Sequence, residues 1–387
     1  MLTRLVDRAC VRGKCADVSE SISRSTCVFR GCLLGMLVVG LRAVPTANRG
    51  LVGNGLLVVG ARAVPGAHWS QSRPLHLNLA ASGFVARLPP AEPTAPLSRI
   101  KDAVAGSDGS LYVLDGGRGV VHVFDRRGAL RRIVGGPGRG DGQMLYPEAI
   151  AVDEAGRLYV LDLGNQRVVI FAPTHAEPAS SAFELLGAAS GLCAVEPGVI
   201  TFGPHSDSLL RFVGINGRVH SQIGTPYSLS RMEELTLARG YLVCARDRGE
   251  VVVLPLILPE LRAYRIGTGQ LLWRVRLPGY TAQLITHSRD RVTITAPPGG
   301  YDEARGIHLI GRDIIVVQVS FRKPRTEARG AAEELTTHYF RLSDGRYLGQ
   351  QSDLPRLVAV AHSIAFFADR TDSATIRGFR FHVAGGP

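Results

Sequence analysis

The stretches Gly109-SLYVLDGGRGVVHVF-Phe124 and Gly156-RLYVLDLGNQRVVIF-Phe171 align without a gap at an offset of 47 residues, with nine identities in sixteen positions. In each stretch an apolar, β-branched run is followed by a glycine-containing turn and a second apolar run. Repeats of about this length that carry several short strands are typical of propeller blades. The alignment therefore predicts an antiparallel unit that is copied around an axis.

One unit can be followed strand by strand in the second copy. Residues Ala149–Val152 form a short apolar strand, and Asp153–Gly156 form a turn in which Asp bonds its own backbone and Gly takes a positive φ. Leu158–Asp162 and Arg167–Phe171 are the second and third strands. In the first copy an outer fourth strand follows at Ala129–Val134. Each unit is thus predicted to be a four-stranded meander.

The stretch Pro147-EAIAVDEAGRLYVLDLGNQRVVIF-Phe171 resembles an NHL repeat, whose pattern is P-x-G-I-A-V-D, then G-x-I/L-Y-V, then D-x-x-N-x-R and an aromatic residue. Ala149 stands where the family has Gly. In the preceding unit Arg118 replaces the Asn and Val120 replaces the Arg. The good match covers residues 103–171. The resemblance implies an all-β fold, a six-bladed β-propeller of four-stranded antiparallel blades.

Later units are predicted at 199–212, 241–273, 313–349 and 364–379. The sixth unit ends before a fourth strand can form, which would leave an exposed sheet edge. Subtracting 47 from the outer strand of the first unit leads to Gly83–Leu88. We therefore expect this N-terminal strand to pair beside Arg377–Val383 and to close the ring.

The predicted domain organisation has three parts. Residues 1–70 are a signal-like or non-structural segment, 71–98 are a linker that includes the ring-closing strand near 83–88, and 99–387 are the propeller. Of the formal charge of +12, half lies in the first 70 residues, which hold nine Lys and Arg against three acids. No stripe of basic and aromatic residues is present, so nucleic acid is not an expected partner.

The N-terminal segment carries an apolar run, Leu33–Leu41, after Arg24 and Arg30. The run is too short for a transmembrane helix, which needs roughly 20 residues, but it suits the apolar part of a secretory signal. A near copy of it ends in Ala61-Arg62-Ala63. These features predict export, with cleavage near residues 47–67 and a periplasmic or secreted location. A start codon assigned too far upstream and a short tandem duplication are the alternatives.

Six cysteines are present. Cys10, Cys15, Cys27 and Cys32 have spacings that suit zinc poorly, and no histidine lies among them. Cys193 and Cys244 are isolated within apolar runs, so each is expected to be a buried small hydrophobe.

Candidate ligand-binding residues follow from the predicted rim, where the turns between second and third strands meet the loops between blades. They are Arg118, Arg139, Glu148, Asn165, His205, Asp207 and Arg370, with Asp141, Arg246 and Asp247 also on this predicted rim. Asp115, Asp162 and Asp369 recur at equivalent positions and are expected to bond turn amides. Arg167 is expected to reach a carboxylate or a carbonyl between blades.

No reactive constellation is evident. The sequence has no HExxH, EF-hand or P-loop motif, and His205-Ser206-Asp207 are neighbours in one turn, whereas a triad needs converging elements. The run Gly135–Gly142 is expected to be a flexible loop between blades. No cofactor is expected. The sequence favours a non-catalytic scaffold that presents its rim and axial channel to a protein, peptide or glycan. The alternative is a calcium-dependent, lactonase-like hydrolase or lyase, to which Glu148, Asn165 and Asp207 would contribute. The oligomeric state is left open.

Overall fold

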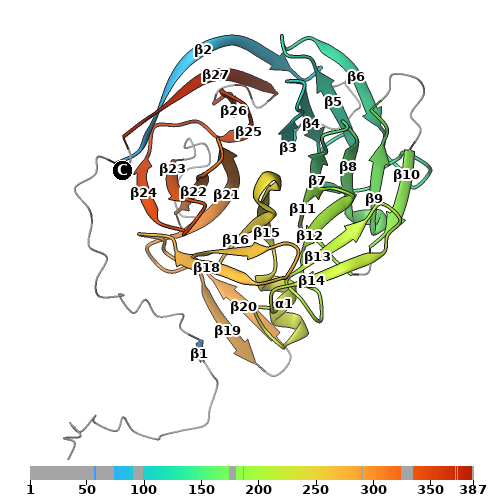
Figure 1. Cartoon of the computed structure of the whole chain (residues 1–387). Helices are drawn as coiled ribbons and strands as arrows, with labels where there is room; N and C mark the ends of the chain where they lie inside the picture. Colours follow the sequence, from blue (N-terminus) through green and yellow to red (C-terminus); the bar gives the residue numbers. More distant parts are fainter. Residues whose placement is uncertain are drawn as a thin grey trace, which may run out of the picture. The chain divides into compact units, whose positions relative to one another are not determined.

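The computed structural model describes residues 56–57, 74–89, 99–173, 180–185, 187–288, 291–323, 334–370, 372 and 374–385. Within these residues, six four-stranded antiparallel sheets are arranged in a ring (Figure 1). The predicted fold class, an all-β six-bladed β-propeller, is confirmed.

In each blade the first-named strand lies nearest the axis and the last-named strand is outermost (Figure 1). Blade 1 contains β3 (Ile100–Ala105), β4 (Leu111–Asp115), β5 (Val120–Phe124) and β6 (Leu130–Gly135). Blade 2 contains β7 (Pro147–Val152), β8 (Leu158–Asp162), β9 (Arg167–Phe171) and β10 (Ser180–Glu184). Blade 3 contains β11 (Gly191–Val195), β12 (Gly198–Phe202), β13 (Leu210–Gly214) and β14 (Val219–Ile223). Blade 4 contains β15 (Gly240–Ala245), β16 (Glu250–Pro255), β17 (Glu260–Arg265) and β18 (Leu271–Arg276). Blade 5 contains β21 (Tyr301–Ile310), β22 (Ile314–Arg322), β23 (Leu335–Arg341) and β24 (Tyr347–Gln351). Blade 6 contains β25 (Leu357–Ala361), β26 (Ile364–Ala368), β27 (Thr375–Ala384) and β2 (His76–Arg87).

The position of a strand in its blade explains its sequence pattern. All five residues of β4 and of β8, both LYVLD, are buried, because a neighbouring blade covers each face of these second strands. The outermost strand β14 alternates instead between partly buried and exposed residues and ends at the buried Ile223. Each innermost strand contacts the innermost strands of both neighbouring blades, which completes the ring.

The two copies that predicted the repeat occupy equivalent places. Tyr112 pairs with Val104 and Val123, and Tyr159 pairs at the same register with Ala151 and Ile170. The predicted turn is also present, since the Asp153 Oδ1 accepts the Arg157 amide at 2.8 Å and Gly156 has a φ of 79°.

The N-terminal strand β2 closes the ring as the outer strand of blade 6, as predicted. It is longer than expected and begins at His76. Its register places Val85 opposite Arg377, while Leu77 lies opposite Val383, so the predicted stretch pairs with the first part of β27. Phe84 is 5% exposed and packs edge-on against Phe366 of β26, with ring centroids 4.9 Å apart.

Two insertions were not predicted. Helix α1 (Arg231–Leu237) lies between blades 3 and 4, and a hairpin of β19 (Leu284–Ser288) and β20 (Arg291–Thr295) lies between blades 4 and 5. They contact each other over a small core that includes Leu237 and Ile285. The short strand β1 (Leu56–Leu57) pairs with β19.

The predictions for Leu33–Leu41, for cleavage near 47–67 and for Cys10, Cys15, Cys27 and Cys32 concern positions of which the structure describes only residues 56–57. The domain boundaries stay predictions. Among the described residues, no helix has the length and apolar character required to cross a membrane.

Shortening Phe84 tests the closing strand. Phe84→Ala should lower the free energy of unfolding by about 3–5 kcal/mol, because it removes a buried ring from the contact between β2 and β26. Val85→Ala, at a neighbouring position that is 45% exposed, should change it by less than about 0.5 kcal/mol. Urea denaturation measures both, and equal effects would show that β2 does not carry a buried face.

Candidate functional site

Consecutive strands run antiparallel, so the turns between second and third strands share one rim with the loops between blades. We call this the loop rim. The turn between the first and second strands lies on the opposite rim. Arg246 and Asp247 belong to the short 3-10 helix η2 (Arg246–Arg248) between β15 and β16. Their predicted place on the loop rim is therefore wrong. Arg246 donates to the Val152 carbonyl at the end of β7.

The recurring aspartates are turn anchors, as predicted. The Asp115 Oδ1 accepts the amides of Arg99 at 2.9 Å and Gly117 at 3.0 Å. The Asp162 Oδ1 accepts the amide of Leu145 at 2.7 Å. Each carboxylate thus ties the loop that enters its blade to the second strand. Asp369 accepts the amide of Asp372, which lies in the turn between β26 and β27.

Asn165 and Arg167 hold the glycine-rich loop. The Asn165 Nδ2 donates to the Gly138 carbonyl at 2.9 Å, and the Arg167 Nη2 donates to the carbonyls of Gly140 and Gln143 at 2.8 Å each. Arg167 also donates to the Asp162 carboxylate at 3.1 Å, so its predicted role is confirmed. These bonds tie the predicted flexible loop to blade 2. Asn165 lies at the end of the 3-10 helix η1 (Leu163–Asn165).

The other candidates on the loop rim divide into engaged and exposed residues. Asp207 pairs with Arg211 at 2.8 Å and accepts from Gln222. The Arg370 Nη2 donates to the Asp353 carbonyl at 2.7 Å. The Arg118 Nε lies 3.9 Å from the Asp115 carboxylate. Two further candidates, Arg139 and Asp141, are exposed.

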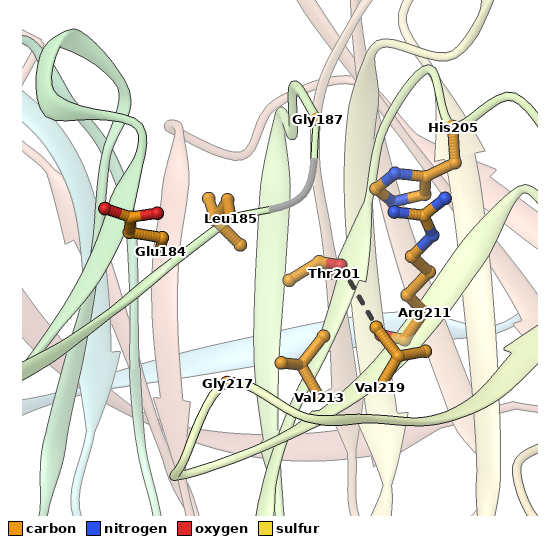
Figure 2. Close-up of a pocket in the computed structure, with 9 residues that line it drawn as sticks. All are labelled: Glu184, Leu185, Gly187, Thr201, His205, Arg211, Val213, Gly217 and Val219. Atoms are coloured by element: carbon orange, nitrogen blue, oxygen red, sulfur yellow. Dashed lines mark hydrogen bonds between the residues drawn. The ribbon is translucent and has the colours of Figure 1, made fainter.

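A small recess opens between blades 2 and 3 at the loop rim. Figure 2 shows His205 beside Arg211 on one side of it, with Leu185 and Glu184 toward blade 2. His205 is 3% exposed, and among the described residues neither of its ring nitrogens has a hydrogen-bond partner. Burial and the nearby Arg211 charge lower the pKa of His205 to about 4, so its imidazole is neutral at pH 7.

The recess is narrow. Its free volume of about 10 Å³ is roughly the room that one water needs. A shallow depression lies next to it and shares Glu184; it is lined by the predicted residues Arg139 and Asn165 together with Arg167. The recess can therefore admit a single small polar group, while the depression offers a broader surface.

A second group of charged side chains lies at the axis, where the innermost strands begin. Glu148 of β7 forms an ion pair with Lys101 of β3 at 2.8 Å. Asp102 accepts the Ala103 and Ile150 amides at 2.9 Å each, so its carboxylate links blades 1 and 2. Burial raises the pKa of Asp102 to about 6, against the effect of these two bonds.

The axial group draws on five blades. Burial raises the pKa of Tyr241 in blade 4 to about 12. The charge of Arg356 in blade 6 acts to lower this pKa, and the charges of three carboxylates act to raise it, namely those of Asp102, Glu303 and Glu148. Burial lowers the pKa of His308 in blade 5 to about 4, with Arg356 acting in the same direction. We call Lys101, Asp102, Glu148, Tyr241, Glu303, His308 and Arg356 the axial cluster.

Cys193 and Cys244 do not stand apart, as the sequence had suggested. They form a disulfide between β11 and β15, the innermost strands of blades 3 and 4, with Cα atoms 6.0 Å apart. Both are partly exposed rather than fully buried. The prediction of isolated buried thiols is wrong because the ring brings these two strands side by side.

The residues suggested for calcium do not converge. Glu148 pairs with Lys101, Asn165 bonds the glycine-rich loop, and Asp207 pairs with Arg211. Within the described part of the chain, no three His, Cys, Asp or Glu side chains are grouped as metal ligands.

Comparisons with known proteins agree with this geometry. Residues 94–181 match a family described as a 6-bladed beta-propeller. A member of the DUF4221 family from Bacteroides vulgatus has a similar structure, with a TM-score of 0.54 and 10% identity over 80% of this chain and 99% of that one. A streptogramin B lyase has a TM-score of 0.46 and 9% identity over 80% of this chain and 98% of that one. At this identity such likeness concerns the fold alone. No curated protein sequence matches the chain.

Sequence reasoning named Glu148 but missed the rest of the axial cluster. One signal was available, because Lys101 and Glu148 are 47 residues apart, which is the blade offset. Both stand near the start of an innermost strand, where the neighbouring residues are mainly apolar. Arg356 has no such counterpart in the sequence.

The buried neutral His205 predicts acid sensitivity. Because its folded pKa of about 4 lies below the unfolded value near 6.5, the unfolded state gains protons first as pH falls from 6.5 to 4, and stability is lost in that window. His205→Leu should remove up to about 3 kcal/mol of this loss. Urea denaturation at pH 7 and pH 4.5 measures it, with the exposed His382→Gln as control. An unchanged pH profile in His205→Leu would contradict a neutral buried ring.

Proposed function

We propose that this chain is a non-catalytic binding scaffold, an NHL-like propeller that presents its axial end and loop rim to a protein, peptide or glycan. The observation that carries the proposal is the axial cluster, in which charged and polar side chains on or next to the innermost strands of five blades act on one another electrostatically. Convergence of separate elements on one place is what a binding site requires. The turn aspartates, by contrast, serve the scaffold.

The NHL type of the blades is supported by the contacts of blade 2. Asp162, Asn165 and Arg167 occupy the three polar positions of the repeat pattern, and they bond one another and the loop that enters the blade. Their partners give a physical reason for these residue types at these spacings.

An extracytoplasmic location, periplasmic or secreted, belongs to the proposal. A structural disulfide is favoured in an oxidising compartment, and Cys193 and Cys244 are bonded. This agrees with the signal-like apolar run that the sequence carries at Leu33–Leu41.

The disulfide provides a test of this location. Protein recovered from the extracytoplasmic fraction of its native host should show no free thiol at Cys193 or Cys244 after unfolding. Reduction of the disulfide, or the double substitution Cys193→Ser with Cys244→Ser, should lower the free energy of unfolding by about 2–4 kcal/mol, since the bond closes a long loop. Thiol titration and urea denaturation measure these effects. Recovery from the cytoplasm with both thiols free would refute the location.

Binding can be tested with the exported protein on a random 12-residue peptide library and on a glycan array. We expect the screens to yield specific ligands. Their affinity should fall at least tenfold in the double variant Lys101→Gln with Glu148→Gln, because a neutral glutamine then replaces each of two charged side chains at the axial end. Arg276→Gln, on the exposed outermost strand β18, is the matched control. Three results would contradict the proposal. They are the absence of any specific ligand for the unchanged protein, equal affinities of the double variant and the Arg276→Gln control, and chemical conversion of a bound ligand seen by mass spectrometry.

A further inference from the structure

The backbone around Arg356 is held by dedicated side chains of blade 5. Gln318 of β22 is completely buried, accepts the Leu357 amide at 2.7 Å and donates to the Pro355 carbonyl at 2.9 Å. His308 lies 3.1 Å from the Leu357 carbonyl through its Nε2, which donates this bond. Both sides of Arg356 are thereby fixed at the entrance to β25.

The Arg356 side chain itself makes no hydrogen bond or ion pair within the described part of the chain, and its Nε is buried. Its charge nevertheless acts on Asp102 in blade 1, Tyr241 in blade 4 and His308 in blade 5. Blades 4 and 6 are not neighbours in the ring, and both turn their innermost strands toward the axis (Figure 1), so we place the guanidinium on the axial side of its blade. A fixed backbone thus presents a cation that has no partner in the part of the chain that the structure describes.

The nearby carboxylates are engaged elsewhere. Asp102 accepts two backbone amides, and Glu148 pairs with Lys101. Glu303 pairs with Arg305 at 2.8 Å and with Arg322 at 3.1 Å. A partly buried guanidinium without a counter-charge is costly. An incoming anion would relieve that cost.

The surroundings of Arg356 narrow the kind of anion. Tyr241 keeps its proton and His308 is neutral at pH 7, so neither repels a negative group. Other side chains of the innermost strands are mainly apolar and keep part of their surface exposed at the edges of the clusters between blades, as at Val104, Val195, Leu242, Val243 and Val360. The hydroxyl groups of a sugar would need many hydrogen-bond partners here, whereas an aliphatic side chain attached to the anion would need none.

We propose that Arg356 binds the terminal carboxylate of a peptide whose last residue is apolar. The planar guanidinium donates two parallel hydrogen bonds to the carboxylate, and the aliphatic side chain packs on the apolar part of the innermost strands. This inference rests on the proposed binding function and names the ligand of its axial site.

The test uses isothermal titration calorimetry at low salt, with N-acetyl-alanyl-leucine and its C-terminal amide as probes for the exported protein. The acid should bind at least tenfold more tightly than the amide. Arg356→Gln should abolish that preference, Arg356→Lys should retain part of it, and the control Arg276→Gln should leave it unchanged. The melting temperature of Arg356→Gln should stay the same or rise, since within the described residues the side chain has no partner to lose and its uncompensated charge is costly.

Equal binding of acid and amide, or a preference that persists in Arg356→Gln, overturns the carboxylate role. Binding of galacturonic acid through Arg356 without any binding of the dipeptide assigns the site to a glycan and also overturns the inference. In each of these outcomes the scaffold function stands if library ligands still lose affinity in the Lys101→Gln, Glu148→Gln variant. Failure of both experiments removes the proposed function as well.

Discussion

Apolar packing between neighbouring blades is the constraint on which the rest of this structure depends. One buried cluster lies at each of the six blade interfaces, so the second and third strands of a blade are covered on both faces. A blade at an open end would expose such a face to water, and at about 25 cal/mol per Å² this is a large loss. The ring must therefore close, and β2 closes it by pairing along β27 and placing Phe84 in the cluster between blades 6 and 1.

This use of both sheet faces restricts where polar chemistry can be placed. Charged groups are left with the turns and with the ends of the innermost strands. At the turns, carboxylates such as those of Asp115 and Asp162 accept hydrogen bonds from backbone amides. At the axis, Lys101 and Glu148 neutralise each other. At the loop rim, His205 differs from these aspartates, since its buried ring has no hydrogen-bond partner among the described residues and lines a recess of water size.

Sequence alone predicted much of the ring, because blade packing imposes a repeating pattern of buried strands. The 47-residue offset located blades 1 and 2 and, by subtraction, the closing strand. It failed in blade 4, where Tyr241–Ala245 is apolar enough to resemble a second strand although it is the innermost one, so Arg246 was assigned to the wrong rim. The disulfide was missed because its cysteines are 51 residues apart, and only the lateral contact of β11 with β15 makes them neighbours. Helix α1 and the β19–β20 hairpin carry no repeat signal, so the period could not reveal them.

The contrast between Asp162 and Arg356 separates stability from recognition. Asp162 is fully buried and bonds an amide, an asparagine and an arginine, so any change there disturbs the turn of blade 2. Arg356 makes no such bond in the described part of the chain, yet Gln318 and His308 fix its backbone from the adjacent blade. The buried Gln318 amide bonds Thr337 in its own blade and the residues on both sides of Arg356, so the backbone of Arg356 is held in place before any ligand arrives. Preorganisation of this kind lowers the ordering cost of binding, which is why the axis, rather than the well-bonded rim turns, is the part of this propeller best suited to hold a ligand.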